Sequence, residues 1–351
     1  MLKIRKANLK KIFLISALLI ISGCSAEKKA MPAEVTKASQ TVLLNSVSTF
    51  DQLSLLDDTL LKNQIQEMNS SDEDILAEDP ENTNNKIDRI LIVGDSWAVF
   101  PCLFGSMKKM IRHQNINLVN DSRCLKTSKL GIKADEWVGS RQDRRTLKML
   151  KNSPQIKYIY LSLGGNDMMG NWTKDYTTAD EIALFEKTSK TIQKIMTNYL
   201  NIRPDLKIIL SGYDFPHFKT KHTLGLYKTI YDRMGRPSDL RINDTLVRFM
   251  QQLSKVENKK NIFFINHIGI AQYYDGVPED SFPQKSTLHP DFISSFNDSA
   301  SVGGEVNLHS SDDSMINWFY LANDAFHLSQ KNYLNVMNHT YRNILSNIIT
   351  N

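Results

Sequence analysis

The chain has 351 residues, of which 41% are hydrophobic and 23% are charged, a composition typical of a globular protein with a substantial core. The formal net charge is +5, but five of the 43 basic residues and none of the 38 acidic residues precede Cys24. Beyond that point the two signs balance, so the composition gives no support for nucleic-acid binding.

The amino terminus has the organisation of an export signal. Residues 1–11 are basic, residues 12–21 form an apolar run, and Ser22, Gly23 and Cys24 follow. An apolar run of this length is shorter than the roughly 20 residues that a membrane-spanning helix needs. We therefore predict a signal peptide over residues 1–23, with an uncleaved membrane anchor as the alternative.

The sequence Ile21-Ser22-Gly23-Cys24 also resembles the lipobox of bacterial lipoproteins. The resemblance implies that Cys24 is lipidated and becomes the first residue of an exported, membrane-anchored protein. By resemblance to the sorting rules of Gram-negative lipoproteins, Ser25 at the next position favours an outer-membrane or periplasmic location if the host is Gram-negative. Residues 24–86 are polar and acidic and poor in aromatic residues, which predicts a flexible tether. A helix over residues 49–68 that docks on the domain is the alternative for part of it.

From residue 87 onward, short apolar runs alternate with stretches of helical periodicity. This alternation predicts a three-layer α/β/α sandwich with a central parallel sheet of about five strands, formed by residues 87–351. The predicted strands are residues 89–93, 116–119, 156–163, 206–210 and 262–265. The predicted helices are residues 99–113, 134–150, 179–200, 239–256 and 330–349. Two insertions without predicted secondary structure, residues 215–237 and 273–318, are candidate walls of a substrate site.

Functional side chains in such sheets gather at the carboxyl ends of the strands. Ser96 follows the first strand, Asn166 follows the third, and Asp324 and His327 precede the last helix. Each is unremarkable alone, because Ser and Asp cap helices and Asn occurs in turns. Together they supply the nucleophile, oxyanion donor, orienting acid and base of an acyl-transfer site.

In this combination the chain resembles the SGNH hydrolase superfamily, also called GDSL esterases and lipases. Gly94-Asp95-Ser96 matches the first block, Gly164-Gly165-Asn166-Asp167 the third, and Asp324 with His327 the last. The resemblance implies that Ser96 is the nucleophile and that Asp324 orients His327, the base. It also implies an oxyanion hole formed by Ser96, Gly131 and Asn166, with Gly139 as a weaker candidate than Gly131. Trp97 follows the serine where many members have a smaller aliphatic residue.

Other polar residues have structural interpretations. Cys102 and Cys124 are a candidate disulfide, because an exported protein occupies an oxidising compartment; two separate buried thiols are the alternative. Asp95 and Asp167 are expected to brace their loops. Among the remaining histidines, His217 and His267 are expected to be hydrogen-bonded structural residues, and His289 and His309 surface residues.

These observations predict a lipid-anchored serine ester hydrolase that needs no metal or organic cofactor. Its substrate would be an ester of a lipid or an O-acylated glycan. One alternative is an acyltransferase that uses the same triad. The other is a non-catalytic surface lipoprotein that binds a ligand.

Overall fold

The computed structural model describes residues 87–219, 223, 225–275, 309–318 and 322–349. The predicted signal peptide, Cys24 and the tether over residues 24–86 lie outside these ranges, as does His289. Within the described residues, no helix combines the length and the apolarity that a membrane span requires.

Five parallel strands form the central sheet in the order β2-β1-β3-β4-β5. The strands are β1 (Arg89–Gly94), β2 (Val119–Asn120), β3 (Ile156–Ser162), β4 (Lys207–Ser211) and β5 (Ile262–Ile265). The parallel sheet and four of the predicted strands are confirmed, whereas the strand predicted over residues 116–119 shares only Val119 with the two-residue β2. Apolar side chains from Ile90 to Val93 are fully buried, which explains why this strand is a continuous apolar run.

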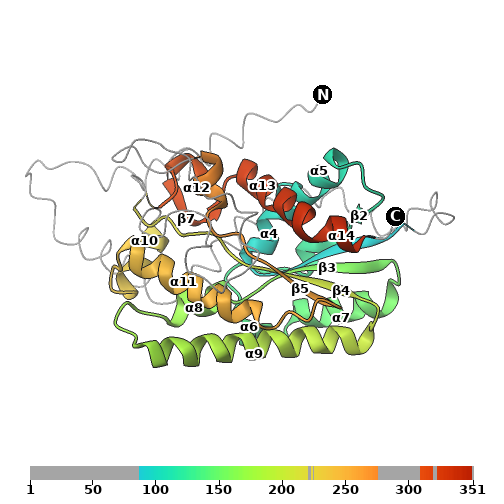
Figure 1. Cartoon of the computed structure of the whole chain (residues 1–351), viewed down its shortest axis with the longest axis horizontal. Coiled ribbons are helices and arrows are strands. Elements are labelled where there is room, and N and C mark those ends of the chain that lie inside the picture. The colour runs from blue at the N-terminus through green and yellow to red at the C-terminus, as the bar shows by residue number, and fades with distance from the viewer. Residues whose placement is uncertain (1–86, 220–222, 224, 276–308, 319–321, 350–351) are drawn as a thin grey trace, which may run out of the picture. The chain divides into compact units, whose positions relative to one another are not determined.

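Helices cover both faces of the sheet (Figure 1). One layer contains α4 (Ser96–Leu103), α5 (Ser106–His113), α13 (Gln330–Thr340) and α14 (Ser346–Ile348). The other contains α6 (Ala134–Trp137), α7 (Arg141–Asn152), α8 (Gly165–Asn171), α9 (Thr178–Ile202) and α11 (Asp239–Ser254). The predicted three-layer sandwich is therefore the observed architecture.

Two predicted helices are each divided in the structure. The helix predicted over residues 99–113 is α4 and α5, separated at Gly105, which has a φ of 61°. The helix predicted over residues 134–150 is α6 and α7, separated at Gly139 with a φ of 72°. A left-handed residue cannot continue a right-handed helix, and in both places it is a glycine that adopts this conformation.

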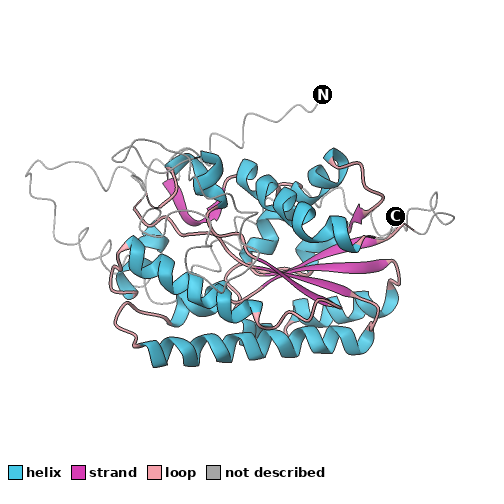
Figure 2. Cartoon of the chain, in the orientation of Figure 1, coloured by secondary structure: helices cyan, strands magenta, loops and turns pink. Residues whose placement is uncertain are grey.

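The two insertions contain secondary structure that the sequence reading did not predict. The first holds α10 (Gly225–Arg233), and the second holds α12 (Ile270–Asp275) and β6 (Met315–Trp318). Strand β6 pairs antiparallel with β7 (Ala322–Leu328) in a separate two-stranded sheet (Figure 2). Asp324 and His327 therefore lie on a strand, and Ser329 is the cap of the last helix.

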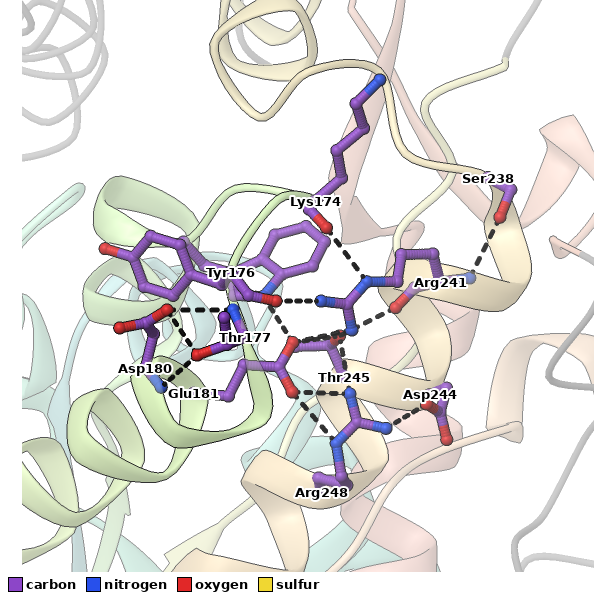
Figure 3. Close-up of polar contacts among 11 residues, drawn as sticks. Lys174, Tyr176, Thr177, Asp180, Glu181, Ser238, Arg241, Asp244, Thr245 and Arg248 are labelled. Atoms are coloured by element: carbon purple, nitrogen blue, oxygen red, sulfur yellow. Dashed lines mark hydrogen bonds and ion pairs between the residues drawn. The ribbon is translucent and has the colours of Figure 1, made fainter.

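A buried carboxylate joins the long helix α9 to α11 (Figure 3). The carboxylate of Glu181 lies 2.7 Å from Arg241 and 2.7 Å from Arg248, and it accepts a hydrogen bond from the Trp172 indole at 2.9 Å. The Arg241 guanidinium also lies 5.1 Å from the centre of the Trp172 ring. Although burial raises the pKa of Glu181, the indole donor and the two arginines lower it further, so the net pKa is below its usual value. Trp172 directly follows α8, the helix that carries Asn166. These contacts therefore hold the end of α8 against α9 and α11.

Candidate active site

The first strand of the sheet delivers Ser96 to the start of α4. The strand ends at Gly94, whose φ is 134°, and a Cβ at this position would lie 1.9 Å from the carbonyl oxygen of Ser162. Only glycine allows β1 to turn this close to β3. Ser96 is the first residue of α4 and is 7% exposed. At this position the partial positive charge of the helix amino terminus favours negative charge on or beside the serine oxygen.

Asp95 braces this turn, as expected from the sequence. Its carboxylate accepts hydrogen bonds from the Trp97 N–H at 3.0 Å, the Ser162 hydroxyl at 3.2 Å and the Tyr213 hydroxyl at 2.6 Å. Burial raises the pKa of Asp95 to about 7, although these donors lower it. The turn that holds Ser96 is thus fixed to β3 and to Tyr213, two residues after the end of β4.

Asp324 and His327 are in direct contact on β7. The Asp324 Oδ2 lies 2.8 Å from His327 Nδ1, and Oδ1 accepts the backbone N–H groups of Phe326 and His327. Burial of Asp324 raises its pKa, but the interaction with His327 and the hydrogen bonds lower it further, so the net pKa lies below its usual value. Asp324 is therefore an anion at neutral pH, and it orients the imidazole with Nε2 facing away from the carboxylate.

Side-chain contacts connect α4 to the strand that carries the histidine. The Phe100 ring lies 4.5 Å from the His327 ring, between centroids, and the Trp97 indole N–H donates to the Phe326 carbonyl oxygen at 3.2 Å. Ser96 and Phe100 are four residues apart on one helix, so they share a face of α4. The structure therefore brings the serine and the acid–base pair to the same side of this helix.

The two candidate oxyanion blocks also meet. The Asn166 amide donates to the Ile132 carbonyl oxygen at 3.1 Å, and the Asp167 carboxylate accepts the Ala134 N–H at 2.8 Å. Burial raises the pKa of Asp167 to about 6, and its role is to brace, as expected. Gly131 lies beside this junction with a φ of 69°. An amide nitrogen carries two hydrogens, so one Asn166 donor remains for a ligand.

Gly139 does not fit the same role. Its N–H donates to the Asp143 carboxylate at 2.8 Å, at the start of α7. Because this donor already has an acceptor, Gly131 is the better of the two candidates, in line with the sequence.

The sulfurs of Cys102 and Cys124 form a disulfide, with a Cα–Cα distance of 6.1 Å. Cys102 lies on α4 and Cys124 on the 3-10 helix Ser122–Lys126, a few residues before Gly131. The bridge therefore joins the helix of the candidate nucleophile to the segment that leads into the oxyanion loop.

The other histidines occupy structural positions. The buried His217 lies 2.7 Å from an Asp312 oxygen, and His267 lies 3.2 Å from the buried His339, both through ring nitrogens. His309 was expected at the surface, but its ring is half-buried and stacks on His217 at 3.9 Å. The insertion containing His309 folds back against the loop after β4, which sequence spacing cannot reveal.

In the second candidate wall, residues 273–318, Tyr273 and Tyr274 contact each other, with ring centres 5.0 Å apart. Phe282, Phe292 and Phe296 lie outside the described residues. Within the described ranges, no group of three or more His, Cys, Asp or Glu side chains is arranged to hold a metal ion.

The sequence reading missed one residue at the site, Tyr227 on α10. Its hydroxyl donates to Asp324 Oδ2 at 2.7 Å and lies 3.2 Å from His327 Nδ1. A signal for this helix exists in the sequence. Apolar side chains recur at helical spacing through the segment, at positions 226, 227, 230, 231 and 234.

A scan against protein-family models finds no match, and a search of curated proteins finds no relative. Solved structures with a similar fold do exist. They include a family 3 carbohydrate esterase from Clostridium thermocellum, with 11% identity, a TM-score of 0.34, and coverage of 74% of this chain and 96% of that one. A carbohydrate acetylesterase from Sinorhizobium meliloti has 10% identity, a TM-score of 0.43, and coverage of 74% and 100%. A putative platelet activating factor from Streptococcus pneumonia has 12% identity, a TM-score of 0.41, and coverage of 84% and 99%. These likenesses concern the fold.

Proposed function

We propose that the protein is a serine ester hydrolase of the SGNH type, with Ser96 as nucleophile, His327 as base and Asp324 as the acid that orients it. The observation that carries the proposal is the joined pair of Asp324 and His327 packed against α4. The His327 ring touches Phe100, one helical turn from Ser96. A serine at a helix start, a base and an orienting carboxylate in one place are the parts of nucleophilic acyl transfer.

In the proposed reaction the Ser96 Oγ attacks an ester carbonyl carbon while its proton moves to His327 Nε2. The resulting oxyanion accepts hydrogen bonds from the Ser96 and Gly131 N–H groups and the Asn166 amide, each worth about 3 kcal/mol of barrier. Collapse breaks the ester C–O bond, and His327 returns the proton to the leaving alcohol. Water then attacks the acyl-enzyme, with His327 again as base, and releases the acid and free Ser96.

The proposed substrate class is an ester of a lipid or of an O-acylated glycan. An assay with p-nitrophenyl esters from acetate to palmitate would test the proposal and sort the two, because an acetylesterase prefers the shortest acyl group and a lipase the longer ones. Ser96→Ala is expected to abolish hydrolysis. Ser106→Ala is the matched control, since Ser106 also begins a helix and is fully buried but lies on α5, outside the site.

Activity that persists in Ser96→Ala would overturn the assignment of the nucleophile. If no ester is cleaved but Ser96 reacts with a fluorophosphonate probe, acyl transfer to a sugar acceptor becomes the function to assay. If no ester is cleaved and Ser96 does not react with the fluorophosphonate probe, the alternative of a non-catalytic lipoprotein that binds a ligand is favoured.

We further propose that the enzyme is exported and attached to a membrane through lipidated Cys24, at the outer membrane in a Gram-negative host. The basic, apolar and lipobox segments of residues 1–24 support this location. Metabolic labelling with palmitate tests it. The wild-type chain should take up label into the membrane fraction, and Cys24→Ala should not. Equal labelling of the two chains would refute lipidation at Cys24.

A further inference from the structure

Tyr227 lies beside the acid–base pair, although it comes from the insertion between β4 and α11. Its side chain is 6% exposed, and its hydroxyl donates to the Asp324 oxygen that also faces His327 Nδ1. We propose that Tyr227 is a positioning residue for the Asp324–His327 pair, holding the carboxylate and setting the basicity of His327. This inference rests on the proposed ester hydrolase function for its kinetic consequences.

The hydrogen-bond pattern explains what the hydroxyl does. Asp324 Oδ1 accepts two backbone N–H groups, and Oδ2 is shared between Tyr227 and His327. The Tyr227 donor stabilises the carboxylate anion and fixes the direction of Oδ2. It also withdraws electron density from the oxygen that stabilises the imidazolium. Without it, Asp324 would be a stronger acceptor and would stabilise protonated His327 more strongly.

Helix α10 is fastened firmly enough to hold this hydroxyl in place. On the β7 side, the Tyr227 ring lies 5.3 Å from the Phe326 ring, and the His217 N–H donates to the Ala325 carbonyl oxygen at 2.8 Å. A parallel bridge pairs Thr223 with Asn323. The insertion therefore packs along the strand that carries the acid and the base.

The other side of α10 contacts the segment that carries the candidate oxyanion donor. The Arg233 guanidinium donates to the Met169 carbonyl oxygen on α8, and the Lys174 N–H donates to the Met234 carbonyl oxygen at 2.9 Å. Because Asn166 lies in the first turn of the same short helix α8, α10 connects the strand that carries His327 to the helix that carries the candidate oxyanion donor. Tyr227 is the only residue of α10 for which the described contacts reach both Asp324 and His327.

Several other ionisable groups surround the Asp324–His327 pair. Any test must distinguish their effects on the pair from the effect of Tyr227. Asp95 interacts electrostatically with His327, and the buried Tyr333 interacts with both Asp95 and Asp324. Burial raises the pKa of Asp95 to about 7, so its ionisation falls in the pH range where a histidine also titrates. A pH–rate profile alone would mix the two, and a residue-specific titration of His327 is needed.

The test compares Tyr227→Phe with Tyr231→Phe in the full chain. Both changes remove one hydroxyl from α10, and the Tyr231 hydroxyl donates to the Pro237 carbonyl oxygen at 2.8 Å, away from Asp324. For Tyr227→Phe we expect kcat to fall roughly 3- to 10-fold with KM unchanged. The acidic limb of the kcat/KM profile should move to higher pH by about half a unit or more. Tyr231→Phe should change neither.

A nitrogen-15 NMR titration of histidine-labelled protein, with His327 assigned by His327→Gln, gives a second readout. The imidazole of His327 should titrate at higher pH in Tyr227→Phe than in the wild type and in Tyr231→Phe. An unchanged titration and an unchanged acidic limb in Tyr227→Phe would overturn the inference, even if kcat fell through loss of folded protein. If the wild type cleaves no ester but the titration still shifts, the proposed function fails and the role of Tyr227 stands.

Discussion

The indole N–H of Trp97 donates to the carbonyl oxygen of Phe326 at 3.2 Å, although 229 residues of sequence separate them. Trp97 follows the proposed nucleophile, and Phe326 precedes the proposed base. Together with the contact between the Phe100 and His327 rings, this hydrogen bond joins the helix that carries Ser96 to the strand that carries His327. It also gives a structural role to Trp97, at the position where many SGNH enzymes have a smaller aliphatic residue.

Replacing Trp97 with Phe tests this role. An aromatic ring is retained, but the indole N–H and its five-membered ring are lost, so we expect kcat to fall about 3- to 10-fold and the free energy of unfolding to fall by about 2–3 kcal/mol. Trp137→Phe is the matched control, because its indole N–H donates to the Tyr199 hydroxyl at 2.8 Å in the opposite helical layer. It should lose similar stability in urea unfolding and keep its kcat. Equal loss of kcat in both variants would contradict the role of Trp97.

Asp95 predicts a distinct pH dependence of stability. Its pKa is raised by burial from 3.8 to about 7 in the folded chain, so folding favours the protonated form. The stabilisation is fully present below pH 4 and is lost as the pH rises through 7. Relative to Asp95→Asn, the wild type should lose roughly 4 kcal/mol of unfolding free energy between pH 4 and 8. Chemical denaturation at several pH values measures this, and parallel curves for the two chains would disprove it.

The Glu181 cluster predicts a large effect from a neutral substitution. Glu181→Gln removes the charge that Arg241 and Arg248 share, and those guanidinium groups are 29% and 33% exposed. Because they are partly hydrated, we expect a loss of about 2 kcal/mol rather than the larger penalty of a fully buried pair. Glu186→Gln on the same helix breaks an exposed pair with Lys190 and should leave the free energy of unfolding nearly unchanged. Urea unfolding measures both losses. An equal loss of unfolding free energy in the two variants would contradict the stabilising role of Glu181.

The disulfide predicts sensitivity to reduction. Cys102 and Cys124 are 22 residues apart, and closing a loop of this size stabilises the folded chain by about 3 kcal/mol. The double variant Cys102→Ala/Cys124→Ala should therefore unfold at lower temperature than the oxidised wild type. Dithiothreitol should lower the wild-type Tm and leave that of the double variant unchanged. A wild-type Tm that does not respond to a reductant, with free thiols confirmed by titration, would contradict this stabilisation.

The local sequence pattern was sufficient to predict four strands of the central sheet and most of the helices that cover it. Buried parallel strands are continuous apolar runs such as residues 90–93, and α9 and α11 have long amphipathic repeats, so each element is encoded by adjacent residues. The same local information singled out Ser96, Asn166, Asp324 and His327 as candidates, because the first two follow strand ends and the last two shortly precede the last helix. The division of two helices at Gly105 and Gly139 was missed, because one glycine within an apolar repeat is compatible with either outcome.

Only the tertiary structure could supply the contacts between distant segments. Tyr227 reaches Asp324 across 97 residues and Trp97 reaches Phe326 across 229. His309, which was expected at the surface, stacks on the buried His217. No periodicity links such pairs, since their meeting depends on how the insertions pack once the sheet has formed. The sequence by itself thus determined the layered fold and the residue types of the site. Three-dimensional packing decided which neighbours hold those residues, because burial and hydrogen-bond geometry exist only in the folded chain.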